Sequence, residues 1–399
     1  MESTLSATEC KVKEIELGLL DIKGLLERLR QLVDIRGQRG RRYQLAPLLL
    51  LIVLAKLSGE DKPSAIADWV SGRAEWLAQA LDLKWAKMPH HNTYRRVLAF
   101  VVEPEALDQV VSEHLKSLPG VGASRLIGMD GKAVRGTISA KNPQGQHLLV
   151  AYLPEEGIVL GQADVDGKEN EIVVAPELLG RLDLRGKIVM GDAMHAQRGL
   201  SKQIVDAGGE YIWLIKENQR TVLEEIEYLF APDAPTVLGT MLPHDFVSHQ
   251  ESDKGHGRIE KRRITVSAEL KGYTKWPALE QVFQVERWRT EVKTGKSETA
   301  VVYGVTSLTS KESPAADLAY LIRAYWGVEN GLHGRRDVTF NEDRTRQTLG
   351  RAGHVMASLN NLVIGLLRHA GFANIASARR ACDAILHQTK AQAIARLLT

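Results

Sequence analysis

Two short stretches of this chain predict its fold: Arg125-Leu126-Ile127-Gly128-Met129-Asp130-Gly131 and Lys187-Ile188-Val189-Met190-Gly191-Asp192. Each is a run of apolar residues that leads to an aspartate, and short apolar runs of this kind indicate buried strands. A carboxylate at the tip of a core strand is costly to bury without a partner. We expect Asp130 and Asp192 side by side on neighbouring strands, where their paired oxygens are the ligands that Mg²⁺ prefers.

The hydrophobic pattern around these stretches predicts an α/β protein with several parts. Residues before about 118 have helical periodicity, whereas strands and helices alternate from 125 onward, which favours a central sheet. Strand-like alternation returns after a helix at 221–230, and the residues from 313 onward are helical in pattern. We predict an all-α N-terminal domain over 1–118, an α/β core formed by 119–217 and 301–370, a mostly β insertion over 218–300 and a C-terminal helical segment over 371–399.

A third carboxylate would complete a site for phosphoryl transfer with two metal ions. The candidate is Glu329, on a helix predicted over about 314–332, and its rivals lie in the polar segment that contains Asp337, Glu342 and Asp343. Other interpretations of the two aspartates remain open. Asp130-Gly131 fits a hairpin turn, and Asp192 fits the N-cap of a helix that starts at 196.

Composition excludes several classes of protein. The chain has 399 residues, 44% of them apolar and 25% charged, which is ordinary for a globular protein. The two cysteines lie at opposite ends and form neither a zinc motif nor a disulfide framework. The sequence has no HExxH, Gly-Lys-Ser/Thr or GxSxG motif. The longest apolar run, 45–57, is too short to span a membrane. We expect a cytoplasmic protein without a membrane partner.

Net charge is only +3, so the clustering of basic residues is more informative than their total. Glycines separate the arginines of the segment 36–42, and this composition suits a flexible arm on a DNA backbone. The predicted DNA contacts in this segment are Arg39, Arg41 and Arg42. Asn92, Arg95 and Arg96 stand at a helix start and are residue types of a recognition helix. A solvated basic helix face is an equal interpretation.

Further polar residues follow the predicted core strands. Lys216 ends the strand at 211–216 and could contact a phosphate, although a solvated lysine explains it equally well. Asn218 and Gln219 could orient a base or a phosphate. His195, three residues after Asp192, is either a DNA contact or a surface residue at a helix N-terminus, and we favour the surface position. Arg258, in the insertion, fits either a DNA contact or a charged residue that protects a strand edge.

A set of short motifs resembles one protein family, and the motifs occur in family order over about 35–370. They are Arg39-Gly40-Arg41-Arg42-Tyr43, His91-Asn92-Thr93-Tyr94-Arg95-Arg96-Val97, Asp130-Gly131-Lys132, Gly191-Asp192-Ala193, Lys216-Glu217-Asn218-Gln219, Gly255-His256-Gly257-Arg258-Ile259-Glu260, Trp326-Gly327-Val328-Glu329-Asn330 and Leu332-His333. The chain resembles the Asp-Asp-Glu transposases of bacterial insertion sequences, and within them the H-repeat-associated group with its own N-terminal associated domain.

The resemblance implies a ribonuclease-H-like catalytic core with a β insertion before the last carboxylate. By position, Asp130, Asp192 and Glu329 would form the triad and hold two Mg²⁺ ions, for which Mn²⁺ can substitute. The implied activity is cutting of double-stranded DNA at the element ends, followed by joining of the 3′-OH ends to target DNA. The implied assembly is a homodimer that acts on the bacterial nucleoid.

A related group carries a Tyr-Arg-Glu-Lys signature, which this chain matches in part. Glu329 and the basic Arg336 fit, whereas Ile322 and Tyr325 stand where the group has Tyr and Arg; Arg323 could substitute. Two other functions stay open from the sequence. One is a nuclease of the ribonuclease-H fold that cuts without joining, and the other is a domesticated DNA-binding relative, which predicts an eroded triad.

Overall fold

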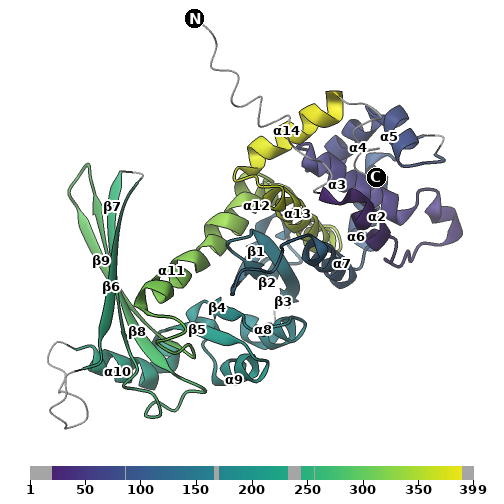
Figure 1. The fold of residues 1–399 in the computed structure, drawn as a ribbon. Coiled ribbons are helices and arrows are strands. Elements are labelled where there is room, and N and C mark those ends of the chain that lie inside the picture. The colour runs from purple at the N-terminus through teal and green to yellow at the C-terminus, as the bar shows by residue number, and fades with distance from the viewer. Residues whose placement is uncertain (1–19, 86, 166–169, 232–243, 256, 389–399) are drawn as a thin grey trace, which may run out of the picture. The chain divides into compact units, whose positions relative to one another are not determined.

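The computed structural model describes residues 20–85, 87–165, 170–231, 244–255 and 257–388 (Figure 1). The chain forms two compact units. Unit 1 comprises Met1–Ala123, Gly131–Lys168 and Glu329–Thr399, and unit 2 comprises Ser124–Asp130 and Glu169–Val328. The chain therefore passes from one unit to the other next to two of the predicted site residues, at Asp130 and at Glu329.

Unit 1 is mainly helical, and two of its helices are buried on all sides. Helix α3 (Leu45–Leu57) has a single residue that is not buried, and α13 (Ala352–His369) is buried from Gly353 to Leu367. The sequence of α3 explains its burial, because a helix that is apolar all round needs neighbours on every face. In α13 the buried polar side chains, among them His354 and Asn361, are hydrogen-bonded to other parts of unit 1. The surrounding helices are α2 (Ile22–Leu29), α4 (Pro63–Ser71), α5 (Ala74–Ala80), α6 (His91–Phe100), α7 (Pro104–Ser117), α12 (Gly334–Val338) and α14 (Ile375–Gln388).

Unit 1 also holds three strands in the order β3-β2-β1, of which β1 (Leu126–Val134) contributes its second half. Strands β2 (Gln146–Leu153) and β3 (Ile158–Val165) form an antiparallel hairpin. Val134 of β1 and Leu148 of β2 pack with Ala357 of α13 in the core. The 3₁₀ turns of this unit are η2 (Gln38–Arg41), η3 (Arg135–Thr137) and η8 (Glu342–Arg344).

Unit 2 is a sheet in the order β1-β4-β5-β9-β8-β7-β6, to which β1 contributes its first half. Strands β1, β4 (Ile188–Gly191) and β5 (Glu210–Ile215) are parallel, and the others follow as antiparallel neighbours. These are β6 (Val247–Gly255), β7 (Arg258–Ser267), β8 (Gln281–Glu291) and β9 (Ser297–Thr306). Helices α8 (Glu171–Gly180) and α9 (Arg198–Asp206) pack on each other, α10 (Arg220–Leu229) packs on β9, and α11 (Ala315–Tyr325) lies along β6 and β7 (Figure 1).

Strand β9 belongs both to the core and to the insertion. Its last residues pair with β5, with Ile215 opposite Tyr303 and Ile212 opposite Thr306, whereas its whole length pairs with β8. The insertion is therefore a direct continuation of the core sheet. The strand orders, with an antiparallel hairpin followed by parallel β1, β4 and β5, confirm the predicted ribonuclease-H-like α/β class with a mostly β insertion.

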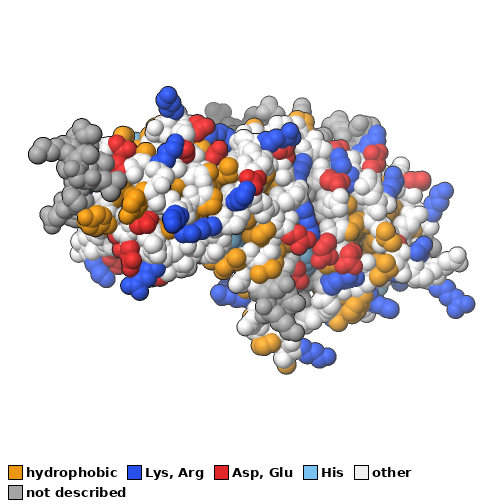
Figure 2. Space-filling model, turned by 90° about the horizontal axis from the view of Figure 1, so that it is seen from below, with side chains coloured by type: hydrophobic (Ala, Val, Ile, Leu, Met, Phe, Trp, Pro, Cys, Tyr) orange, Lys and Arg blue, Asp and Glu red, His pale blue; other side chains and the backbone are white. Residues whose placement is uncertain are grey.

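The structure also bears on the hairpin interpretation of Asp130-Gly131 and on the search for membrane-spanning helices. Asp130-Gly131 is not a hairpin turn, because β1 continues through both residues to Val134. Within the described residues, no helix combines the length and the apolar character that a bilayer crossing requires. Basic and acidic side chains are interspersed on the face drawn in Figure 2, which agrees with the small net charge.

Candidate active site

The register of two parallel strands brings Asp130 and Asp192 to equivalent positions. Met129 of β1 and Gly191 of β4 are Cα partners. Asp130 is the next residue of β1, and Asp192 directly follows the end of β4. Asp130 is partly buried and Asp192 is exposed. The two carboxylates therefore come from adjacent strands of one sheet, as the apolar runs predict.

Asp192 also holds the turn that follows β4. Its side chain accepts a hydrogen bond of 2.5 Å from the backbone N–H of Ala193, as the N-cap of the 3₁₀ turn η4 (Ala193–His195). Lys216 Nζ lies 3.7 Å from Asp192 Oδ1, and both side chains are more than half exposed. Asp192 is therefore an N-cap, but of this short turn and not of a helix at 196, since α9 begins at Arg198.

The segment after β5 holds the segment after β4 through two side-chain amides. Asn218 Nδ2 donates to the carbonyl oxygen of Ala193 at 2.8 Å, and Gln219 Nε2 donates to that of Ala196 at 2.9 Å. Both amides thus bind backbone carbonyl groups of the residues that follow Asp192 in the chain. This support was not evident from the sequence, which suggested DNA contacts for Asn218 and Gln219.

His195 is buried, so the expectation of a surface histidine is wrong. Its Nε2 lies 3.0 Å from Oε2 of Glu171 at the start of α8, and the ring packs against Gly191. Burial follows from the tight η4 turn, which directs the ring inward toward the Glu171 carboxylate. Glu171 is therefore a supporting residue that sequence reasoning missed.

Glu329 lies in a π-helical segment, Val328–His333, which follows α11. π-helical turns are rare and occur frequently at functional sites. The Glu329 side chain is exposed and makes no hydrogen bond or ion pair with any described residue. A carboxylate without such a partner is available to bind a ligand.

The rival carboxylates are engaged by neighbours within unit 1. Asp337 accepts from Lys132 Nζ at 2.6 and 2.8 Å, and Asp343 lies 3.5 Å from the same Nζ. Glu342 is buried and accepts from Arg336 Nε at 2.9 and 3.1 Å. Among the described residues, no three His, Cys, Asp or Glu side chains form a group that could hold a metal ion.

The structure contradicts the prediction that Arg336 contacts DNA, because this side chain does not reach the surface. Its side chain is fully buried, and Nη2 lies 2.8 Å from Oε2 of the equally buried Glu342. A fully buried guanidinium is almost always paired, because a buried charge without a partner is strongly destabilising. The ion pair with Glu342 accounts for a basic residue seven positions after Glu329. No contact with nucleic acid is needed to explain it.

The arginine-rich segment 36–42 is folded and is not a flexible arm. Arg41 donates to the carbonyl oxygen of Asp34 at 2.6 Å, and Arg36 donates to that of Tyr43 at 2.8 Å. The hydrogen bond from Arg36 holds the pKa of Asp34 below its usual value. Arg39 is exposed. A hollow beside this segment is lined by basic, acidic and apolar side chains, among them Arg30, Arg41, Arg42, Lys84, Asp82 and Trp85.

The other predicted DNA contacts lie on exposed surfaces of their own units. Asn92, Arg95 and Arg96 are exposed on the first turns of α6, and Arg95 lines a second hollow with Arg346. In unit 2, Arg258 is exposed at the start of β7, next to the β6–β7 connection.

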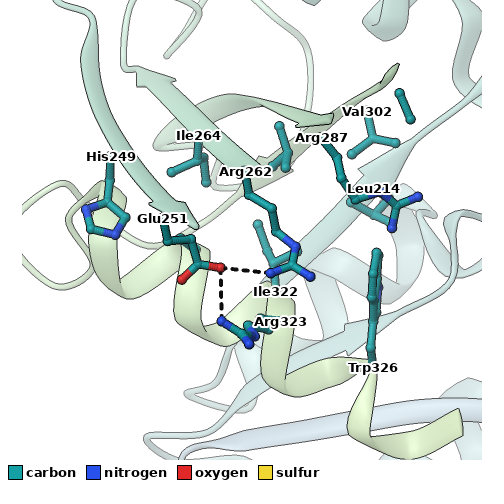
Figure 3. A pocket seen from close by; sticks show the side chains of 13 residues that line it. Leu214, His249, Glu251, Arg262, Ile264, Arg287, Val302, Ile322, Arg323 and Trp326 are labelled. Atoms are coloured by element: carbon teal, nitrogen blue, oxygen red, sulfur yellow. Dashed lines mark hydrogen bonds and ion pairs between the residues drawn. The ribbon is translucent and has the colours of Figure 1, made fainter. Parts of the chain in front are cut away.

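Arg323 is held by acidic side chains of the insertion. Its Nη1 lies 3.3 Å from Glu251 of β6, and Arg262 donates to the same Glu251 at 3.2 Å (Figure 3). The Nη2 atom of Arg323 pairs with Asp253. These residues border a mostly apolar hollow between α11 and the strands, beside Trp326. The Arg287 guanidinium lies 4.8 Å from the centre of the Trp326 ring. Arg323 thus joins α11 to β6.

Comparison with known proteins gives two family matches and several relatives. The family described as Transposase DDE domain matches residues 122–364, and the family described as DDE_Tnp_1-associated matches residues 26–115. A protein of Escherichia coli O157:H7, provisionally named transposase YncI, is 29% identical over 88% of this chain and 88% of its own length. A protein of Escherichia coli K12, provisionally named H repeat-associated transposase YhhI, is 29% identical over 87% of this chain and 91% of its own length.

Among solved structures, a piggyBac transposase synaptic complex with hairpin DNA aligns with a TM-score of 0.45 and 8% identity. The alignment covers 96% of this chain and 80% of that chain.

Proposed function

The chain belongs to the family of proteins with a transposase DDE domain, and we propose that it cuts the ends of its insertion sequence and joins the 3′-OH ends to target DNA. The observation that carries the proposal is the register of β1 and β4, which sets Asp130 and Asp192 side by side. Glu329, exposed on a π-helical turn, is the third member. All three carboxylates are present, which disfavours a domesticated relative with an eroded triad.

The donor chemistry of these residues fits two Mg²⁺ ions. Carboxylate oxygens are hard ligands that select Mg²⁺ or Mn²⁺. The Nε2 atom of His195, three residues after Asp192, is paired with Glu171. Asp130, Asp192 and Glu329 would hold the ions. When bound, such ions activate the attacking oxygen and stabilise the leaving oxygen in phosphodiester chemistry.

The residues around Asp192 would prepare that carboxylate for its task. The Asn218 and Gln219 amides fix the η4 backbone, so that the turn capped by Asp192 keeps its shape. Lys216 sits 3.7 Å from Asp192 at the exposed end of β5, where its charge can neutralise a DNA phosphate. Phosphoryl transfer depends on this kind of positioning and charge neutralisation.

Double-stranded DNA is the proposed partner, and the exposed basic residues of unit 1 are its proposed contacts. The hollow with Arg30, Arg41, Arg42 and Lys84 offers several positive charges to a phosphate backbone. Arg39, two residues before Arg41, is exposed and is a further proposed contact. Asn92, Arg95 and Arg96 on α6 carry the side-chain types that contact base edges. Arg258 of the insertion and Arg323 of α11 extend the proposed contacts to unit 2. A homodimer would hold both element ends at once, in the bacterial cytoplasm.

The test is metal-dependent cleavage of DNA that carries the terminal repeats flanking the gene. Wild type is compared with Asp130→Ala, Asp192→Ala and Glu329→Ala, and a second assay follows joining of the cut ends to plasmid DNA. We expect Mg²⁺- or Mn²⁺-dependent nicking at the ends, lost in all three variants, and joined products with wild type only. Cutting without joining would instead identify a nuclease, and tight end binding without cutting would identify a DNA-binding relative.

A further inference from the structure

We propose that Lys132 is a positioning residue for the carboxylates of Asp130 and Glu329, and that it acts through its ion pairs with Asp337 and Asp343. The inference rests on the proposed function, because it assigns a task to a residue beside the triad. It concerns a cluster of charged side chains that lies wholly within unit 1.

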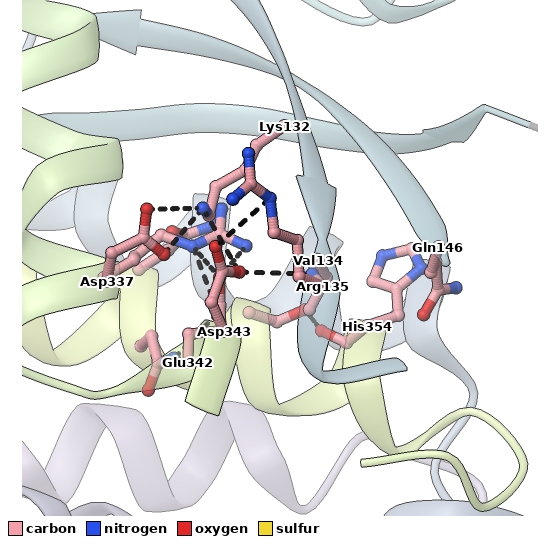
Figure 4. A network of polar contacts seen from close by, with 12 residues as sticks. Lys132, Val134, Arg135, Gln146, Asp337, Glu342, Asp343 and His354 are labelled. Carbon is pink, nitrogen blue, oxygen red and sulfur yellow. Dashed lines mark hydrogen bonds and ion pairs between the residues drawn. The ribbon is translucent and has the colours of Figure 1, made fainter. Parts of the chain in front are cut away.

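The cluster is centred on a nearly buried lysine. The Lys132 side chain is 7% exposed, and its Nζ lies 2.6 and 2.8 Å from the two carboxylate oxygens of Asp337 and 3.5 Å from Asp343 Oδ1 (Figure 4). Ion pairs at the surface contribute little, whereas a buried charge that loses its partner is strongly destabilising. The lysine is therefore fixed in place by two carboxylates.

The cluster joins the two chain segments that carry Asp130 and Glu329. Only Gly131 separates Lys132 from Asp130 on β1. Asp337 lies on α12, which continues directly from the π-helical segment that contains Glu329. Gly131 and Glu329 are both in unit 1, so the ion pair fixes the backbone next to Asp130 relative to the helical stretch that bears Glu329.

The second aspartate of the cluster is itself held from two sides. Asp343 accepts a hydrogen bond of 3.1 Å from the backbone N–H of Arg135, the residue that follows β1 (Figure 4). Its neighbour Glu342 is locked by Arg336 and also accepts from Asn360 Nδ2 at 2.9 Å. The backbone packs closely here, because a Cβ on Gly136 would lie 2.3 Å from the carbonyl oxygen of Thr345. The η8 turn is thus a rigid support for Asp343.

A purely structural ion pair and a positioning ion pair predict different measurements. A structural pair affects the free energy of unfolding but leaves the folded site unchanged. A positioning pair changes the affinity of the folded protein for metal, and loss of such outer partners weakens metal binding or activity by about 10- to 100-fold. Metal affinity of the folded chain therefore separates the two roles.

The experiment compares full-length wild type with Lys132→Met, Lys132→Arg, Asp337→Asn and a matched control, Lys56→Met. Lys56 is also a buried lysine of unit 1, with Nζ 2.9 Å from Asp61, but it lies on α3. Calorimetry gives the Kd for Mn²⁺, thermal unfolding gives the Tm, and cleavage assays give kcat and KM for the DNA ends.

We expect Lys132→Met and Asp337→Asn to weaken Mn²⁺ binding about tenfold or more and to lower kcat with little change in KM. Lys132→Arg should recover most of both losses, because it keeps the charge. Lys56→Met should lower the Tm yet keep the wild-type Kd for Mn²⁺.

Wild-type Mn²⁺ affinity and kcat in folded Lys132→Met would overturn the inference, and so would an equal loss of affinity in Lys56→Met. If Lys132→Met does not fold, Asp337→Asn decides, since it keeps the shape of the side chain. These outcomes leave the proposed function untouched, which fails only if wild type does not cut the element ends.

Discussion

Gly191 lies so close to the His195 ring that a Cβ on Gly191 would be 2.9 Å from the ring's Cδ2 atom. The ring is fully buried and is held by Glu171. Asp192 stands between the two residues in the chain, so the turn that presents its carboxylate is built around the histidine. Any side chain at position 191 has to displace that ring.

Gly191→Ala should therefore destabilise the protein and impair cutting. Overpacking of this kind costs about 1–3 kcal/mol, and the shifted η4 turn would move Asp192. Thermal unfolding and DNA cleavage measure the two effects. Gly199→Ala is the control, because a Cβ there meets nothing within 4 Å; it should leave Tm and cleavage close to wild type. Equal behaviour of both variants would contradict the packing argument.

Asp192→Asn should abolish cutting while DNA binding persists. The substitution keeps an oxygen that can cap η4 but removes the charge that a divalent cation requires. Metal ions contribute several kcal/mol to such reactions, so we expect a loss of at least about a hundredfold in cleavage rate. Cleavage and mobility-shift assays on the same DNA provide the measurement. A variant that still cuts at the wild-type rate would remove Asp192 from the proposed triad.

Arg336→Met should destabilise the fold by about 3–5 kcal/mol, because it leaves Glu342 buried without its partner. Urea unfolding measures the loss. The double variant Arg336→Met/Glu342→Met should recover much of it, since neither charge then remains. A stable single variant with weakened DNA binding would instead restore the assignment of Arg336 to DNA.

The pair of His354 and Asp108 predicts a pH dependence of stability. Burial lowers the pKa of His354, but the hydrogen bond from its ring to Asp108 and the charge of that carboxylate outweigh burial and raise it above the usual value of 6.5. A raised pKa in the folded state stabilises the protein below pH 6.5, and this contribution is lost as the pH rises through the folded-state pKa.

We expect the free energy of unfolding to decrease as the pH rises above about 6.5 and to level off once His354 is neutral. Urea unfolding between pH 6 and pH 9 provides the measurement. In His354→Gln this decrease should be absent or much smaller. An identical slope in wild type and variant would exclude His354 as its source.

The sequence was most informative where apolar runs alternate with polar residues. The strands around 125–130, 187–192 and 211–216, and the helix after 314, follow directly from hydrophobic pattern, and the register of β1 and β4 agrees with the expected pairing of Asp130 and Asp192. Local pattern captures these features because it reflects burial of one short segment at a time.

The ion-pair partners of charged side chains could not be predicted from the local hydrophobic pattern. Arg336 pairs with a glutamate of the next turn and is buried, Arg323 pairs with β6, and Lys132 pairs with Asp337. Composition gives the sign of each charge but not which distant segment folds against it. The arginines at 36–42 show the same limit, because their glycines suggested a flexible arm whereas backbone carbonyls order the segment.

The shared strand β9 has a consequence for any attempt to shorten this protein. Strand β5 is covered on one side by β4 and on the other by the last residues of β9. Excision of the whole β6–β9 region would leave unpaired those backbone N–H and C=O groups of Ile212–Ile215 that face β9. The exposed edge of this buried, apolar strand is a template for pairing with another chain. A truncated derivative that retains Tyr303–Thr306 keeps that template covered, and one that lacks them should aggregate.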